Sequence, residues 1–311
     1  MKKIKGSILI RFFGIILFIY ILAKIDIAEL IASLKEINLI YYLLCILFAI
    51  LGFLIRVWKW QTLTNSIGAK ISFRRLTKIS IKGFFLGLVT PGKLGEFWRA
   101  KYLTEETAVA GGKAFYTALM DRLLDILVVA MVGFSGLIVV YLKFGSGFGW
   151  QISILMFLCL AVLAYFLKRQ KRFFYALLGF FIPSFLKKRA ESFLVEFYQG
   201  FAGLKLKLFI KVLVLTFLYY LIGGPVLHYF VALSLGITIP FWYLFLIVAM
   251  VWLLLAIPVS IFGLGTREAG FIYFFSILGI SSSLAVAFSL LLLLANILLA
   301  IPGAILFLKQ K

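Results

Sequence analysis

The sequence predicts an all-α polytopic membrane protein, and its composition, apolar runs and loop charges all favour that class. Of its 311 residues, 64% are hydrophobic and only 14% are charged. The mean hydropathy is +1.15, so the chain is far more apolar than a soluble globular domain. Several apolar runs are long enough to cross a bilayer as helices. We expect a single membrane domain, residues 1–311, because the connections are too short for a separate soluble domain.

The charge balance is strongly basic, with 32 Lys and Arg against 11 Asp and Glu and a formal net charge of +21. In a membrane protein such an excess gathers in cytoplasmic loops, where it orients the helices and meets anionic lipid. Nucleic-acid binding is therefore not expected. Both cysteines, Cys45 and Cys159, lie in apolar runs, so we predict no disulfide, no metal site and no cofactor.

The apolar runs predict six full spans, at 8–24, 39–57, 114–142, 150–167, 208–231 and 284–308. The acidic connection after the first span is placed outside. The cationic and aromatic border after the second span, with Arg56 and Lys59, is placed at the cytoplasmic interface. Both termini then lie in the cytoplasm of a multi-pass protein of the cell membrane. Segment 173–207 mixes Phe and Leu with Lys and Arg, which predicts amphipathic helices on the cytoplasmic face.

Glycine and proline interrupt three of the apolar stretches. Gly223-Gly224-Pro225 lies inside the span 208–231 and predicts a kink, because Pro lacks a backbone donor. Pro91 and Pro258 break two further stretches, and each is followed by glycines and by an Arg and a Glu. Because such residues resist burial in lipid, we interpret both stretches as re-entrant or broken helical hairpins.

The two hairpins predict an inverted-topology repeat, with repeat 1 at about 39–142 and repeat 2 at about 208–308. A shift of 168 positions superposes Ser66-Ile67-Gly68 on Ser234-Leu235-Gly236, Gly95 on Gly263 and Arg99 on Arg267. Many transporters follow this plan, in which broken helices from both repeats meet near the midplane and face a substrate. Chance similarity between apolar segments is the alternative.

Charged residues beside the breaks are the candidate site. One charge at the bilayer centre costs about 2.5–3.5 kcal/mol on insertion scales, so these charges are expected to pair or to contact water. We expect Arg99 and Arg267 to bind a phosphate head group, because a guanidinium binds phosphate through two donors and stays charged. Nearby acids would hold the arginines, and glycine N–H groups would approach the same anion. The predicted substrate-binding set is Gly92, Gly95, Glu96, Arg99, Asp121, Arg122, Asp125, Gly263, Gly265, Arg267 and Glu268.

Other functions remain as alternatives. The charges could serve only to tie the hairpins to the spans. Gly133-Phe134-Ser135-Gly136 is similar to the Gly-x-Ser-Gly of rhomboid-type proteases, and a dyad with His228, the only histidine, is conceivable. Small residues in a membrane helix are more often packing contacts, so we predict no catalytic residue and no enzyme. A lipid-modifying enzyme, an ion channel and a non-catalytic partner of a lipid synthase are further alternatives.

The chain resembles the lysylphosphatidylglycerol synthase transmembrane-region family, which includes the flippase portion of MprF-type proteins and many stand-alone members. The likeness covers nearly the whole chain. It rests on segments 56–60, 91–96 with Arg99, 121–125, and Pro258 with 263–268. We expect a stand-alone member without the soluble aminoacyl-transferase domain, so lipid aminoacylation is not implied.

The resemblance implies movement of a lipid between leaflets. The substrate classes are aminoacyl-phosphatidylglycerol and polyprenyl-phosphate-linked lipids. Transport would proceed by alternating access without ATP hydrolysis by this chain. The expected partners are membrane lipids with an anionic or zwitterionic head group and a separate lipid synthase or glycosyltransferase. Whether the chain forms a homo-oligomer stays open.

Overall fold

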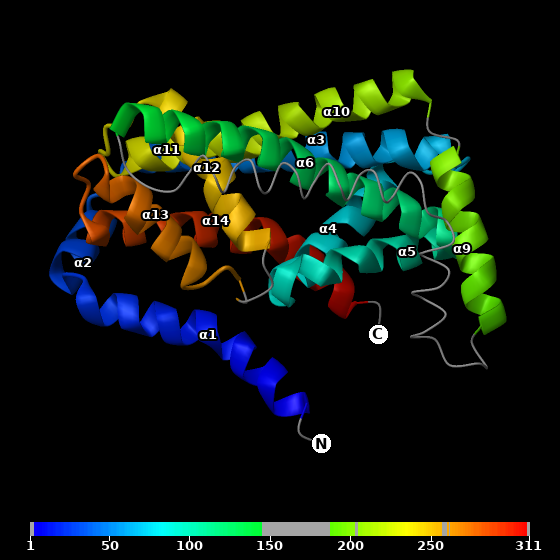
Figure 1. Cartoon of the computed structure of the whole chain (residues 1–311), viewed down its shortest axis with the longest axis horizontal. Helices are drawn as coiled ribbons and strands as arrows, with labels where there is room; N and C mark the ends of the chain where they lie inside the picture. Colours follow the sequence, from blue (N-terminus) through cyan, green and yellow to red (C-terminus); the bar gives the residue numbers. More distant parts are fainter. Residues whose placement is uncertain (1–2, 145–186, 203–204, 257–259, 261, 310–311) are drawn as a thin grey trace.

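The computed structural model describes residues 3–144, 187–202, 205–256, 260 and 262–309. Within these ranges the chain forms helices and their connections, without a strand. The helices lie largely alongside one another in a bundle (Figure 1). The prediction of an all-α polytopic membrane protein is confirmed.

The first half of the chain begins with helices joined by short capped connections. The side chains of Asp26 and Asn38 accept backbone N–H groups at the starts of the second and third helices, as helix caps do. The elements in chain order are α1 (Lys3–Lys24), α2 (Ile27–Lys35), α3 (Leu39–Ser66), α4 (Phe73–Val89), the tight helical turn η1 (Pro91–Phe97), α5 (Trp98–Thr107) and α6 (Gly111–Phe144).

The second half repeats much of this order. The predicted kink is confirmed in η3, where Gly224 has φ −108° and ψ −106°, outside the helical range. The described elements are α9 (Lys187–Ala202), α10 (Leu206–Leu221), the wide turn η3 (Ile222–Val226), α11 (Leu227–Ser234), α12 (Phe241–Ala256), α13 (Thr266–Ser276) and α14 (Ser282–Leu308).

Among the described residues, four helical stretches are long and apolar enough to cross a membrane: Leu39–Ser66, Gly111–Lys143, Leu206–Ser234 and Ser282–Leu308. They match four of the predicted spans. The prediction at 8–24 falls on α1, whose Gly14–Lys24 part is a shorter apolar helix. The prediction at 150–167 lies outside the described residues. Of the predicted amphipathic segment 173–207, the described part is α9 and the start of α10.

Both predicted hairpin breaks fall where helices end. Helix α4 ends at Val89, two residues before Pro91, and α12 ends at Ala256, two residues before Pro258. Pro258 itself lies outside the described residues. The first hairpin, α4 with α5, lies toward one end of the bundle, and the second, α12 with α13, lies toward the other (Figure 1). After the second hairpin, the Ser281 side chain caps the start of α14.

The turns that lead into the two hairpins have the same backbone geometry. Thr64 O accepts the Ala69 N–H at 3.1 Å, and Ala232 O accepts the Ile237 N–H at 2.9 Å. These pairs are related by the 168-residue shift that the sequence suggested. The glycine inside each turn has positive φ, +83° at Gly68 and +66° in the second turn, which favours a residue without a side chain.

Helices α3 and α10–α11 run in opposite directions. The Asn38 N–H at the start of α3 donates to Ser234 O at the end of α11, at 2.8 Å. The end of one helix therefore lies beside the beginning of the other. Each helix leads through its turn into a hairpin, so the hairpins enter the bundle from opposite ends (Figure 1).

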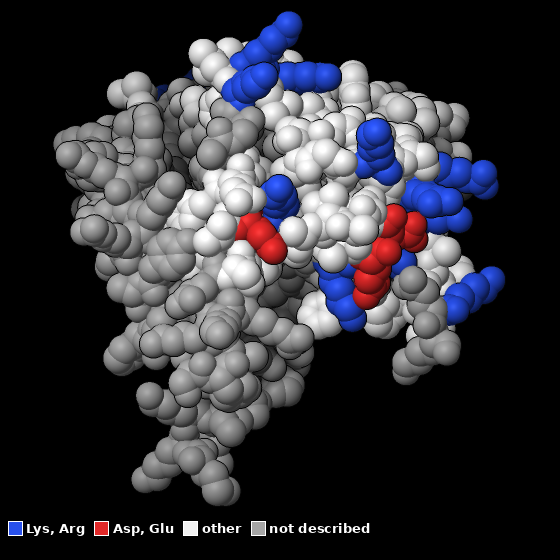
Figure 2. Space-filling view, turned by 90° about the vertical axis from the view of Figure 1, so that its right-hand side faces the viewer, with Lys and Arg blue, Asp and Glu red and all other residues white. Residues whose placement is uncertain are grey.

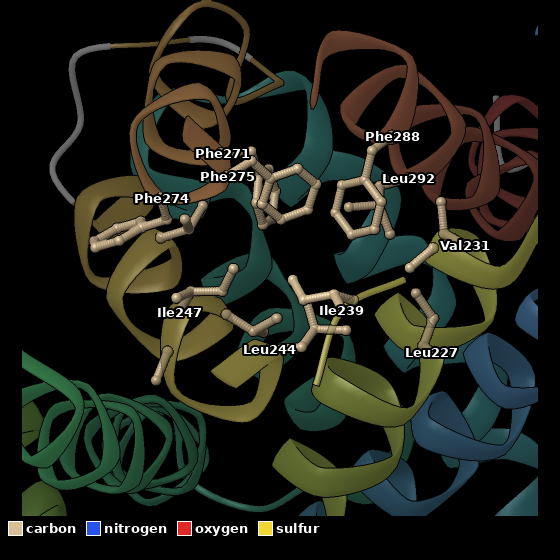
Figure 3. Packing of buried hydrophobic residues seen from close by; sticks show 14 of the residues in the cluster. Leu227, Val231, Ile239, Leu244, Ile247, Phe271, Phe274, Phe275, Phe288 and Leu292 are labelled. Carbon is tan, nitrogen blue, oxygen red and sulfur yellow. The ribbon is translucent and has the colours of Figure 1, made fainter. Parts of the chain in front are cut away.

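Aromatic packing and close helix contacts fix the hairpins in place. Figure 3 shows the cluster among α11, α12, α13 and α14, in which the Phe271 and Phe288 rings lie 4.9 Å apart. Elsewhere glycine brings helices together, because a β-carbon at Gly303 of α14 would overlap the backbone carbonyl of Ile81 in α4. Small residues at such crossings are how membrane helices pack closely.

Candidate functional site

A cavity of about 170 Å³ lies between the two broken hairpins. Residues from both breaks line it, together with residues of α6, the kinked helix and α14. The polar and aromatic residues in its wall are Phe84, Thr90, Lys93, Glu96, Arg122, Asp125, Tyr219, His228, Trp252, Ser260, Phe262, Arg267 and Asn296. Residues that the sequence predicted beside each of the two breaks therefore line one cavity.

The first break is a compact turn closed by Thr90. The Thr90 hydroxyl donates to Leu86 O at 2.8 Å and accepts the Gly95 N–H at 2.7 Å. A β-carbon at Gly95 would overlap the same carbonyl group, which explains the glycine. Lys93 has φ +57°, a conformation that is uncommon for residues with a side chain and is often found at functional sites.

Two predicted glycine donors are already occupied by the protein itself. The Gly95 N–H is bonded to Thr90, and the Gly265 N–H donates to Glu268 Oε2 at 2.6 Å. Gly92 belongs to η1, and Gly263 lines the cavity. A role in contacting an anion stays a prediction for Gly92 and Gly263, whereas Gly95 and Gly265 shape the turns.

Glu96 is held by Arg56 of α3. Both terminal guanidinium nitrogens reach the carboxylate, and Nη1 lies 3.3 Å from Oε1. This fork-to-fork arrangement is the strong form of the ion pair. Gly87 of α4 makes room for it, because a β-carbon there would overlap Glu96 Cγ. The predicted pairing of Glu96 with an arginine is present, but the arginine comes from α3 rather than from either break.

Asp121 joins the first hairpin to α3 through α6. Its Oδ2 lies 2.5 Å from Arg99 Nη2, and its Oδ1 lies 2.8 Å from Lys59 Nζ. Lys59 also pairs with Asp125. The Arg99 guanidinium lies 4.6 Å from the centroid of the Trp60 ring, a distance typical of a cation–π contact.

The prediction that Arg56 and Lys59 lie at the membrane interface is wrong. Arg56 is 6% exposed and Lys59 is 0% exposed, and both are in ion pairs inside the bundle. The signal that could have revealed this was the presence of two basic residues on one face of α3 and two acidic residues on one face of α6. Arg56 and Lys59 are three apart on α3, and Asp121 and Asp125 are four apart on α6, so each pair presents one face.

The second break holds its arginine locally. Arg267 donates from Nη2 to Glu268 Oε1 at 2.8 Å and from Nε to Ser289 Oγ at 2.5 Å. Ser289 in turn donates to Glu268 Oε1 at 2.7 Å. Glu268 also caps α13 through the Gly265 N–H. The acid and the arginine that the sequence proposed as partners therefore bond to each other, and of the two Arg267 lines the cavity.

Arg99 and Arg267 differ in their access to the cavity. Arg267 lines it. Arg99 instead borders a second, much smaller cavity of about 10 Å³, together with Arg56, Ser80 and Glu96. The structure thus brings Arg267, Glu96, Asp125 and Arg122 to one space and places Arg99 behind Glu96.

Two cations of the large cavity form no salt bridge with an acid in the described part of the chain. Arg56, Lys59 and Arg99 are balanced by Glu96, Asp121 and Asp125, and Arg267 is balanced by Glu268. Arg122 and Lys93 both line the cavity, but neither forms a salt bridge with a described acid. The cavity therefore has an excess of positive charge, which suits an anionic ligand.

The structure does not join the residues of the protease alternative. Ser135 is exposed, and its hydroxyl donates to Met131 O at 2.8 Å. His228 lines the cavity and bonds to Gly224 O. Gly133 and Gly136 pack on α12, where β-carbons would lie 2.8 and 3.0 Å from Leu side chains. Within the described ranges, no cluster of three His, Cys, Asp or Glu residues is arranged to hold a metal.

One end of the bundle carries many exposed basic residues. Figure 2 looks onto this end, where Lys and Arg side chains surround a few acidic ones. The first hairpin and the start of α10 lie there (Figure 1). The exposed basic residues of these elements and of the turn before α4 are Lys70, Arg74, Arg75, Lys78, Lys101, Lys205, Lys207 and Lys211.

Comparison with known proteins gives a match over most of the chain. The family model described as the lysylphosphatidylglycerol synthase TM region matches residues 6–303. A UPF0104 membrane protein of Methanocaldococcus jannaschii is 26% identical over 72% of this chain and 93% of its own length. A second one from that organism is 27% identical over 40% of this chain and 37% of its own length. A UPF0104 membrane protein of Archaeoglobus fulgidus is 30% identical over 47% of this chain. That match covers 48% of the Archaeoglobus protein's own length. The chain therefore spans less than half the length of this relative and of the second Methanocaldococcus relative.

Proposed function

We propose a lipid-translocating function for this chain, which belongs to the lysylphosphatidylglycerol synthase TM region family. The substrate would be a phosphate-containing lipid, either an aminoacyl-phosphatidylglycerol or a polyprenyl-phosphate-linked lipid. The protein would act as a flippase that lets the head group cross the bilayer through the cavity between the breaks. It would equilibrate the lipid between leaflets unless a gradient or consumption of the product drives it.

The observation that carries this proposal is that two cations of the cavity wall, Arg122 and Lys93, form no salt bridge with a described acid. Arg122 and Lys93 leave about two positive charges beside a space that both hairpins line. Lys93 is exposed and Arg122 is partly exposed, so both charges are open to a ligand, and a phosphate group would supply the missing negative charge. Arg122 can bind such a group through two donors, and Lys93 can bind it as a point charge.

Alternating access about an inverted repeat is the proposed mechanism. Its support is the antiparallel course of α3 and α10–α11, the matching turns before the two hairpins, and the position of the cavity between the breaks. In transporters of this plan, one repeat moves against the other around a fixed central site. The basic end of Figure 2 would face the cytoplasm, together with both termini.

Leaflet exchange of a head-group-labelled phospholipid in proteoliposomes tests this function. We expect Arg122→Gln to slow exchange at least about tenfold, because the phosphate loses a bidentate charged partner. Arg74→Gln is the matched control, since Arg74 is an exposed cation at the basic end, away from the cavity wall. If the wild-type chain accelerates exchange no more than empty liposomes do, the proposal is wrong. Exchange that survives Arg122→Gln would remove the site assignment.

A further inference from the structure

His228 presents a hydrogen-bond acceptor to the cavity. Its Nδ1 lies 2.7 Å from Gly224 O. A carbonyl oxygen can only accept, so Nδ1 carries the hydrogen, and in the neutral ring Nε2 is then an acceptor. The side chain is 5% exposed and lines the cavity. Nε2 has no hydrogen-bond partner among the described residues.

The surroundings of the ring favour its neutral form. The rings of Phe271 and Phe288 lie 5.9 Å from it, and the ring of Trp252 lies 6.3 Å away. Figure 3 shows these two phenylalanines within the aromatic cluster. The neighbouring titratable pair is Arg267, which lines the cavity, with Glu268. That acid is already bonded to Arg267, Ser289 and the Gly265 N–H. A second cation there would lack a counterion.

Asn296 adds a second acceptor to the same wall. Its Nδ2 donates to Leu292 O at 2.8 Å. Because that carbonyl can only accept, the amide orientation is settled, and Oδ1 is the free end. Oδ1 has no partner among the described residues, and Asn296 lines the cavity. The cavity therefore combines cations that suit a phosphate with two neutral acceptors that phosphate oxygens cannot satisfy.

We propose that the transported head group carries hydroxyl groups beside its phosphate and that His228 Nε2 and Asn296 Oδ1 accept them. This inference rests on the proposed function and narrows its substrate class, because it disfavours aminoacyl-phosphatidylglycerol, whose aminoacyl group carries an ammonium. A hydroxyl is favoured over an ammonium as the donor, because Lys93 and Arg122 give the cavity an excess of positive charge that would repel a further cation. A quaternary amine head group has no donor and leaves both acceptors unsatisfied.

Binding of matched short-chain lipids to the purified full-length chain in detergent tests the inference. Dihexanoyl phosphatidylglycerol and dihexanoyl phosphatidylpropanol have the same phosphodiester charge and differ in the two hydroxyls of the head group. We expect the glycerol lipid to bind about tenfold more tightly, because the propanol lipid leaves the acceptors unpaired. Titration of each lipid against the protein, followed by tryptophan fluorescence, gives the two Kd values.

Variants connect this preference to the residues. His228→Phe should reduce the preference at least about threefold by weakening glycerol-lipid binding while leaving propanol-lipid binding unchanged. Asn296→Leu should act in the same direction, and it serves if the first variant fails to fold. Ser135→Ala is the matched control on the exposed face of α6 and should keep the full preference. A preference unchanged in both cavity variants would overturn the assignment.

The outcomes separate this inference from the function on which it rests. Equal binding of the two lipids by the wild-type chain would refute hydroxyl recognition and leave the flippase proposal intact. Tighter binding of dihexanoyl phosphatidylethanolamine than of the glycerol lipid would also refute it, in favour of an ammonium donor. Absence of binding of all three lipids, with no leaflet exchange in proteoliposomes, would refute the proposed function itself.

Discussion

At the first break, Arg99 reaches across to Asp121 on α6, whereas at the second break Arg267 bonds to the next residue of its own helix. Asp121 also pairs with Lys59 of α3, and Arg56 of the same helix pairs with Glu96. The ion pairs of the first break therefore join the first hairpin, α3 and α6. The arrangement at the second break is completed by one serine of α14 and by the cap of α13. Two positions that superpose in the sequence thus hold their arginines by different means.

The arginine of the first break therefore depends on an acid from another helix, whereas the arginine of the second break is paired with an acid of its own helix. Movement of the first hairpin relative to α3 and α6 would pull apart the ion pairs of Glu96 and Arg99. Movement of α13 would take the Arg267 and Glu268 pair along intact. In an alternating-access cycle, the charged network at the first break is therefore the part that must exchange partners.

The largest expected effect comes from removing the shared acid of the first network. Asp121→Asn leaves Arg99 without its carboxylate and leaves Lys59 with Asp125 alone, and breaking a buried pair costs about 3–5 kcal/mol. Glu268→Gln removes one charged partner and keeps an amide oxygen for the Gly265 N–H, so its loss should be smaller. Unfolding free energies in detergent, measured by denaturant titration, provide the comparison. If Glu268→Gln lost more unfolding free energy than Asp121→Asn, the ion pairs of the second break would be the more important for stability, contrary to this prediction.

A second prediction concerns the space that α4 leaves for Glu96. Gly87→Ala should destabilise the protein by about 1–3 kcal/mol, because the new methyl overlaps the Glu96 side chain. Gly83→Ala on the same helix is the matched control. Its β-carbon would lie 3.3 Å from Arg99 Cβ, so the contact is tight without direct overlap, and alanine favours the helix.

Melting temperatures of the two alanine variants in one detergent decide this prediction. Gly87→Ala should melt clearly below Gly83→Ala. Equal melting temperatures would show that Glu96 and its turn yield easily, contrary to the role of the network in fixing the first break.

The smallest expected effect is the loss of the Thr90 bonds. Thr90→Val removes the hydroxyl that closes the turn and should cost about 1 kcal/mol. Thr104→Val is the control, because that hydroxyl bonds only to the carbonyl four residues earlier in its own helix and its loss should change little. Hydrogen exchange at the Gly95 amide gives a local measurement. Unchanged protection there would mean that Thr90 is dispensable for the turn.

The sequence predicted the helices and the breaks because hydrophobic length and helix-breaking residues are local signals. The helix end at Val89 follows from the proline beyond it, and the kink follows from Gly224 and Pro225. The pairing of charges could not be predicted in the same way. Which acid meets Arg56 depends on the rotation and approach of helices far apart in the chain, and interfacial cations look alike in sequence whether they face lipid head groups or a partner helix.

The cavity was foreseen only in outline. The sequence predicted that residues beside the two breaks meet in one site. Glu96 of the first break and Gly263 and Arg267 of the second do line the same cavity. The contributions of His228 and Asn296 were missed, because each is a lone polar residue in an apolar run and gives no spacing signal. Lys93 lies inside the predicted break but was not included in the predicted binding set. The prediction of substrate contact for the individual charged residues remains to be tested by the variants above.

The kink in α10–α11 links the shape of a helix to the chemistry of the cavity. Gly224 provides both the departure from helical geometry and the carbonyl that fixes the His228 hydrogen on Nδ1. Straightening this stretch would move that carbonyl and release the ring to exchange its donor and acceptor nitrogens. If His228 accepts a hydroxyl as proposed, a lipid that binds this acceptor form also favours the bent helix, by thermodynamic linkage.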